Sequence, residues 1–124
     1  MGIKIKLKIP DELADVLNTL QKKLFEFNRD GLLKLVLYGS WATGRSEPNS
    51  DVDLLMQFQE VSDDLEEKVN DIIYEIMWEK NFNYFISPYI LNGNTYNKLL
   101  KTGSTFLANI EDEGIILWEN TEKK

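Results

Sequence analysis

The most informative segment of this 124-residue chain runs Leu35-Val36-Leu37-Tyr38-Gly39-Ser40-Trp41-Ala42-Thr43-Gly44 and continues, after a polar loop, with Ser50-Asp51-Val52-Asp53. The apolar run that leads into it predicts a central strand buried on both sides. Gly39 allows the backbone to approach a ligand closely or to adopt a positive φ. Ser40 is expected to cap a following helical turn, and its hydroxyl or amide to meet a phosphate. Such strand-to-helix junctions are common, so this half alone also fits a purely structural turn.

The second half of the segment places two acids two residues apart. Alternate residues of a strand point to the same face, so Asp51 and Asp53 are expected side by side. Two carboxylates on one face of an apolar strand repel each other and are costly to desolvate without a cation. The alternative is an exposed strand start with two solvated acids. Combined with the turn at Gly39, the pair favours a site where divalent ions hold a triphosphate for in-line displacement at phosphorus.

Composition restricts the chemistry further. The length and the 43% apolar content predict one domain spanning residues 1–124. A net charge of −7 argues against broad nucleic-acid binding. The absence of cysteine and histidine excludes thiolate chemistry and histidine ligands or bases, and carboxylate-only sites suit Mg²⁺ or Mn²⁺. No apolar run reaches the roughly 20 residues of a membrane span, so we expect a cytoplasmic protein that does not interact with membranes.

Hydrophobic periodicity predicts alternating strands and helices along the chain. A half-exposed strand is expected over residues 3–9, and a helix from Pro10 to the Arg29-Asp30-Gly31 stop. The remaining expected elements are strands over residues 32–38, 51–58, 83–91 and 115–118, a long helix from Ser62, and short helices over residues 95–101 and 104–112. Pro88 cannot donate to a strand ladder, so its strand should lie at an edge or carry a bulge. Asn92-Gly93-Asn94 is expected to form a turn.

The two motifs closely resemble the signature of the DNA polymerase beta-like nucleotidyltransferase superfamily, and the short chain resembles its minimal (MNT) members. The resemblance implies an α+β fold in which a mixed sheet carries helices mainly on one face. It also implies that Gly39 and Ser40 bind the nucleotide phosphates, and that Asp51 and Asp53 bind the metal and carry catalysis. Minimal members are commonly paired with a small helical HEPN-type partner in toxin–antitoxin modules, and some transfer AMP from ATP to a tyrosine of that partner.

Other residues near the motif are weaker candidates for nucleotide binding. Ser50 lies within the motif, and Arg45 could clamp a phosphate through two N–H groups or remain a solvated loop residue. Trp41 is expected in the core or at a partner contact rather than as a platform for a base. Three residues, Phe106, Leu107 and Ile110, are expected to dock a C-terminal helix on the sheet, or with Trp118 to form an exposed partner face.

One departure from the family pattern leaves two functions open. The family usually has a third carboxylate on the strand after the long helix, but residues 83–91 contain no acid. Asn83 or Ser87 could take that position, although a neutral oxygen binds Mg²⁺ more weakly and is a poor base. The first hypothesis is therefore an enzyme that moves a nucleoside monophosphate, with AMP from ATP favoured, onto a protein hydroxyl. The second is a non-catalytic nucleotide-binding or partner-binding subunit.

Overall fold

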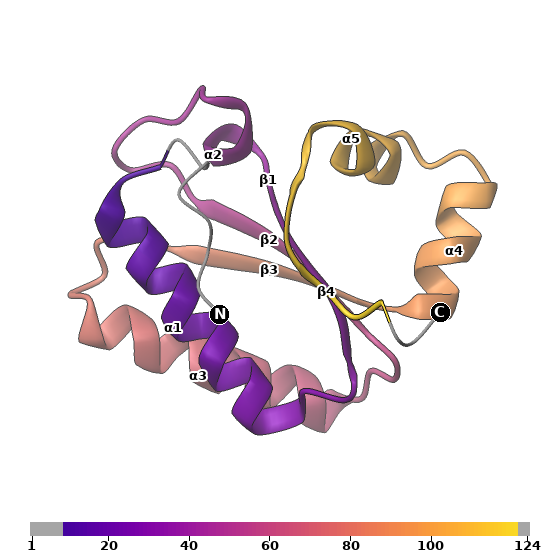
Figure 1. The fold of residues 1–124 in the computed structure, drawn as a ribbon, viewed down its shortest axis with the longest axis horizontal. Coiled ribbons are helices and arrows are strands. Elements are labelled where there is room, and N and C mark those ends of the chain that lie inside the picture. Colours follow the sequence, from indigo (N-terminus) through magenta and orange to yellow (C-terminus); the bar gives the residue numbers. More distant parts are fainter. Residues whose placement is uncertain (1–8, 122–124) are drawn as a thin grey trace.

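The computed structural model describes residues 9–121. Within them, a four-stranded sheet in the order β3-β2-β1-β4 crosses the middle of the molecule (Figure 1). The strands are β1 (Leu32–Tyr38), β2 (Val52–Phe58), β3 (Ile86–Asn92) and β4 (Ile115–Glu119). β1 is antiparallel to β2 and β4, whereas β2 and β3 are parallel, so the sheet is mixed. The predicted α+β class is confirmed, whereas the strand predicted over residues 3–9 falls almost entirely outside the described residues.

The two long helices, α1 (Asp11–Asn28) and α3 (Asp63–Glu79), cover one face of the sheet (Figure 1). The short helices α4 (Gly93–Lys101) and α5 (Thr105–Glu113) pack over part of the other face. A single turn of helix, α2 (Ser40–Thr43), follows β1 directly. No helix among residues 9–121 is both long enough and apolar enough to cross a bilayer.

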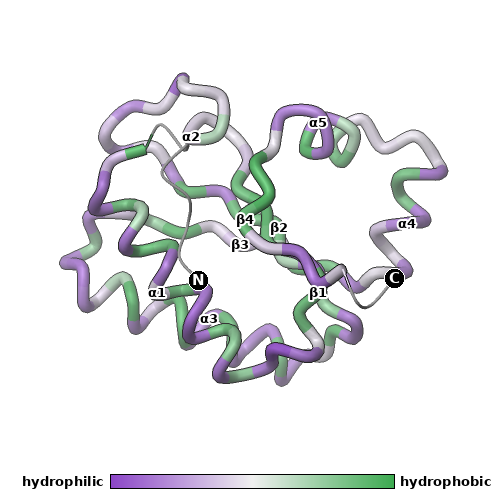
Figure 2. Tube along the Cα trace, viewed as in Figure 1, coloured by the Kyte–Doolittle hydropathy of each residue, from purple (hydrophilic) through white to green (hydrophobic). Residues whose placement is uncertain are grey.

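Alternation along β2 divides the interior into two cores. Val52, Leu54, Met56 and Phe58 point toward α1 and α3 and are fully buried. Leu55, with the opposite parity, contributes to a smaller core under α4 and α5. The two helices that cover this core are amphipathic, and hydrophobic (green) and hydrophilic (purple) segments alternate along α1 and α3 (Figure 2). The apolar faces of these amphipathic helices are therefore used against one side of the sheet.

Two boundaries differ from the sequence-based expectation. β3 begins at Ile86 rather than at Asn83, because the Asn83 N–H bonds to the Lys80 carbonyl in a turn that ends α3. The expected turn at residues 92–94 is instead the start of α4, where Asn92 Oδ1 accepts the Thr95 N–H at 2.7 Å and caps the helix. The placement of Pro88 at a sheet edge is confirmed, and its strand keeps a regular register.

Candidate active site

Gly39 and Asp53 meet at the centre of the site. Gly39 follows β1 and caps α2 with φ +81°, a conformation that residues other than glycine rarely adopt. A Cβ on Gly39 would lie 3.3 Å from Asp53 Cγ and would collide with its Oδ2. The glycine is therefore required twice, once for its backbone angle and once because the Asp53 carboxylate occupies the space of a side chain.

The two aspartates differ in environment, and the strand predicted from residue 51 begins at Val52, so only Asp53 belongs to it. Asp51 is exposed just before β2, whereas Asp53 lies within β2 and is half-buried. Burial, and then the negative charge of Asp51, raise the pKa of the Asp53 carboxyl above its ordinary value. A bound cation would relieve both effects, so this oxygen-only donor set fits Mg²⁺ or Mn²⁺.

Trp41 connects the two motifs. Its buried indole Nε1 donates to the Ser50 carbonyl at 3.0 Å, and this bond fixes the chain directly before Asp51. The Ser50 hydroxyl accepts the Glu47 N–H at 2.8 Å and closes the loop. The core position predicted for Trp41 is confirmed, and its ring is too buried to serve as a platform for a base.

Ser40 and Arg45 occupy the two ends of the turn after β1. Ser40 is the first residue of α2, and the cap position belongs to Gly39, so the predicted capping role of Ser40 is wrong. The Arg45 backbone N–H bonds to the Ser40 carbonyl at 3.0 Å, while its side chain is exposed. The Arg45 guanidinium makes no ion pair within residues 9–121, so it remains accessible to an anion.

The two candidates for the third position are in different places. Ser87 of β3 lies in register beside Asp53 and shares its face of the sheet. Asn83 precedes the strand, and its amide donates to Glu12 Oε2 at 3.3 Å, so its predicted placement beside the aspartates is wrong. No cluster of three or more acids that could hold a metal occurs in the part of the chain that the structure describes. Ser87 is therefore the only one of the two candidates that the fold brings to the site.

Three aromatic residues complete this face and were not predicted as site residues. Tyr38 of β1 pairs with Asp53 on the side opposite Ser87. Burial, followed by the Asp53 charge, raises the pKa of Tyr38 to about 12. The half-exposed ring of Phe106 packs edge-on against Tyr38 and Tyr89, with centroids 5.7 and 5.4 Å apart. Strand parity could have indicated Tyr38 and Tyr89, but the approach of α5 that brings Phe106 there has no local signal.

This arrangement, a small turn after a central strand facing paired carboxylates on its neighbour, defines a nucleotidyltransferase type of site. The sequence matches the nucleotidyltransferase domain family over residues 17–117. The chain therefore belongs to this family, and it is a transferase of the nucleotidyl-transferring class.

One curated protein and two solved structures are similar to this chain, and the two structures share its fold. The chain is 29% identical to the Methanocaldococcus jannaschii protein named "Putative protein adenylyltransferase MJ0141", over 84% of this chain and 97% of that protein. A crystal structure of a toxin–antitoxin complex with AMP-PNP shares the fold, with a TM-score of 0.53 and 19% identity over 83% of this chain and 73% of that one. A mutant form of the MntA-HpeT toxin–antitoxin is similar, with a TM-score of 0.52 and 16% identity over 93% of this chain and 76% of that one.

Proposed function

We propose that this protein transfers AMP from ATP to a hydroxyl of a protein acceptor, with Mg²⁺ or Mn²⁺ held by Asp51 and Asp53. The observation that carries the proposal is the close approach of Asp53 to Gly39. It sets the acidic pair against the turn where the triphosphate is expected to bind. The ion would neutralise the phosphates and the charge that develops on the pyrophosphate leaving group.

In the proposed reaction the acceptor oxygen bonds to the α-phosphorus, and the bond from that phosphorus to the bridging oxygen of the β-phosphate breaks. Pyrophosphate leaves, and the acceptor hydroxyl gives its proton to water. Gly39 and Ser40 would contact the phosphates, and Arg45 and Ser50 would flank them from the ends of the loop. Asp51 and Asp53 hold the negative charge that positions the ion.

The protein acceptor is supported by the relatives. The M. jannaschii protein carries the name "Putative protein adenylyltransferase MJ0141", and two solved structures of similar fold are toxin–antitoxin structures, one of them with AMP-PNP. By this analogy we propose a small helical HEPN-type partner as the acceptor and an antitoxin role for this chain. A cytoplasmic location stays a prediction from the sequence.

The serine at the third position favours a second candidate, a subunit that binds nucleotide and partner without transfer. Ser87 stands beside Asp53 where a carboxylate would accept the acceptor's proton. Glu60 and Asp63 cannot replace it, because they follow the far end of β2, seven or more residues beyond Asp53. At about 3.3 Å per residue they lie on the order of 20 Å away. We therefore expect slow transfer in the first case and none in the second.

Calorimetric titration with ATP tests metal-dependent binding. Affinity should rise on adding Mg²⁺ in the wild type but not in the Asp51→Asn/Asp53→Asn double variant. Equal affinities in all four combinations would contradict the metal site. Transfer of label from α-³²P-ATP to the partner then distinguishes the enzyme from the non-catalytic subunit. The enzyme labels the partner, and the labelling is lost when Asp51 and Asp53 are replaced, whereas the non-catalytic subunit gives no labelling.

A further inference from the structure

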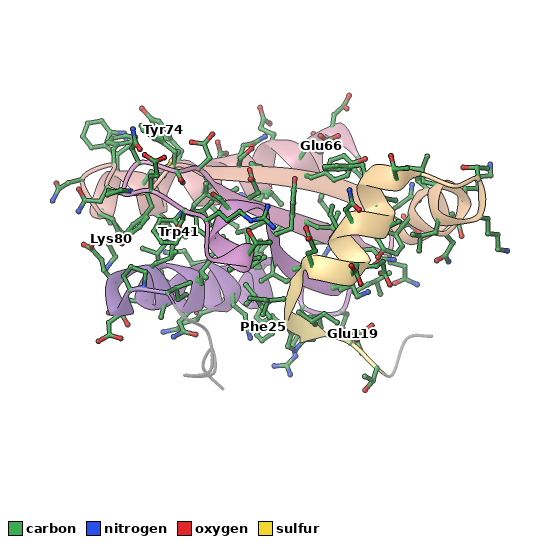
Figure 3. The ribbon with its side chains drawn as sticks, turned by 90° about the horizontal axis from the view of Figure 1, so that it is seen from above. Phe25, Trp41, Glu66, Tyr74, Lys80 and Glu119 are labelled. Carbon is green, nitrogen blue, oxygen red and sulfur yellow. The ribbon has the colours of Figure 1, made fainter. Side chains whose placement is uncertain are left out.

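Four aromatic side chains gather on the surface where α3 ends and β3 begins. They are Tyr74, Trp78, Phe82 and Phe85, and we call them the aromatic patch. Tyr74, Trp78 and Phe85 are 54%, 61% and 53% exposed, and Tyr74 points away from the sheet on the outer side of α3 (Figure 3). Phe82 lies at the centre of the group. Its ring centroid is 5.3 Å from that of Trp78 and 6.1 Å from those of Tyr74 and Phe85.

The backbone under the patch is strained. Asn81 and Phe82 have φ values of +57° and +55°, and they are the only residues other than glycine with positive φ among residues 9–121. The left-handed conformation costs roughly 1–2 kcal/mol for a residue with a side chain. Here the Phe82 N–H bonds back to the Met77 carbonyl at 2.8 Å and directs the ring between Trp78 and Phe85. The fold thus accepts a conformational cost to assemble an exposed aromatic surface.

Charge around the patch selects the partner. Glu67 and Asp71 lie on the same outer stripe of α3 as Tyr74 and Trp78, at helical spacing, and both are exposed. Acidic residues outnumber basic ones on this helix, where the only lysine is Lys68, although Lys80 follows at its C-terminal end and Glu75 is paired with Lys23 at 3.1 Å. The acids are Asp63, Asp64, Glu66, Glu67, Asp71, Glu75 and Glu79. A second copy of this chain, with its own net charge of −7, would bring like charges together. A partner with basic residues around an apolar centre would instead be complementary.

The patch is continuous with the candidate active site. The carbonyl of Phe85 accepts the N–H of Val52 at 2.8 Å, and Val52 lies between Asp51 and Asp53. Two residues after Phe85, Ser87 stands beside Asp53. A protein seated on the aromatic patch therefore lies next to the start of β2, where the aspartates are.

We infer that the aromatic patch is the docking surface for the acceptor protein, which meets it with a basic face that has an apolar centre. The inference rests on the proposed function for the identity of the partner as the acceptor. In it, Trp78 and Phe85 anchor the complex, the acidic stripe steers the approach, and the acceptor hydroxyl is brought to the site beside Ser87. The residues of the patch are positioning residues, because they touch the acceptor protein and not the reacting atoms.

The test uses the full chain and, as the probe, the purified HEPN-type partner proposed above. The dissociation constant of the pair is measured by calorimetry for Trp78→Ala/Phe85→Ala and for the matched control Ile116→Ala, an exposed apolar residue of β4. We expect the double variant to raise Kd by about 30-fold or more and the control to change it less than about threefold. Mg²⁺–ATP affinity should stay unchanged in both, which also shows that the site is folded.

A charge reversal provides an independent variant that leaves the aromatic rings in place. Asp71→Lys should slow association and weaken its salt dependence, whereas Asp30→Lys, an exposed change at the opposite end of the sheet, should not. The inference is overturned if no complex forms, if the patch variants bind like the wild type, or if the chain dimerises through the patch. Failure of the proposed function looks different: Asp53→Asn would then change neither ATP binding nor labelling, while the patch variants would still lose the partner.

Discussion

The two faces of the sheet are used in opposite ways. On the face covered by α1 and α3, the side chains of β2 are apolar and fully buried. On the other face the same strand presents Asp53, which is half-buried beside Tyr38 and Ser87 and is only partly covered by α4 and α5. The even-numbered residues of this strand thus form part of the larger core, whereas its odd-numbered face carries both Asp53 and Leu55, which belongs to the smaller core. The closed face can keep the strand fixed while the open face admits a ligand.

The largest change is expected on the open face. Ser87→Asp would place a carboxylate beside Asp53, where it can complete an ion's coordination and accept the acceptor's proton. We expect AMP transfer to accelerate by up to about 10²–10⁴-fold, the usual contribution of a general base. Labelling of the partner with α-³²P-ATP measures the rate.

Asn83→Asp is the matched control for that substitution. It adds the same acid to a residue outside β3, at a position whose side chain faces Glu12, so it should leave transfer unchanged. Equal acceleration by both variants would mean that the register of β3 is not what brings the acid to the site.

On the closed face the expected effect is a loss of stability. Leu54→Ala removes a fully buried side chain from the larger core and should lower the free energy of unfolding by about 2–5 kcal/mol. Leu91→Ala, at a partly buried site in the smaller core, should cost clearly less because its surroundings are less enclosed. Urea denaturation of the two variants measures the difference, and similar losses would contradict the contrast between the faces.

Two glycines with positive φ, Gly39 and Gly103, allow the effect of backbone strain to be distinguished from the effect of a steric contact with Asp53. Gly39→Ala and Gly103→Ala both force a side chain into positive φ, at a cost of roughly 1–2 kcal/mol each. Only at Gly39 does the new Cβ meet Asp53, because nothing lies within 4 Å of it at Gly103. We therefore expect Gly39→Ala to lose more stability than Gly103→Ala and to be the only one of the two with reduced Mg²⁺–ATP affinity. Unchanged affinity in Gly39→Ala would make Gly39 a purely structural turn.

The smallest effect concerns the charge of Asp53. A carboxyl whose folded-state pKa is raised binds its proton more tightly in the native state, so stability falls as pH rises from its ordinary value of 3.8 through the raised value. Without divalent ions, Asp53→Asn should therefore melt slightly higher than the wild type above this window and equally below it. Added Mg²⁺ should stabilise only the wild type and reduce or reverse the difference. Thermal melts across pH, with and without a chelator, measure both effects.

Local sequence was sufficient for most of the secondary structure and for the core of the site. Periodicity predicted α1 between Pro10 and Arg29, since its apolar residues recur at helical spacing. The spacing of Asp51 and Asp53 predicted a shared face, because side-chain direction in a strand depends only on parity. Gly39 was singled out because glycine permits a positive φ or a close approach of the backbone, and the structure shows φ +81° there.

Other features required the folded chain. The choice of Ser87 over Asn83 depended on where α3 ends, since a backbone bond from Asn83 to Lys80 delays the start of β3. The expected docking of the C-terminal helix is confirmed for Leu107 and Ile110, which are buried in the smaller core. The alternative of an exposed partner face that includes Trp118 is wrong, because Trp118 packs against Phe25 of α1. Phe106 instead reaches Tyr38 and Tyr89, and Phe82 completes the aromatic patch. The sequence by itself determined the features that depend on a few neighbouring residues, such as helix periodicity and the spacing of the two aspartates. Contacts between distant segments depend on how whole helices pack against the sheet, which no local pattern specifies.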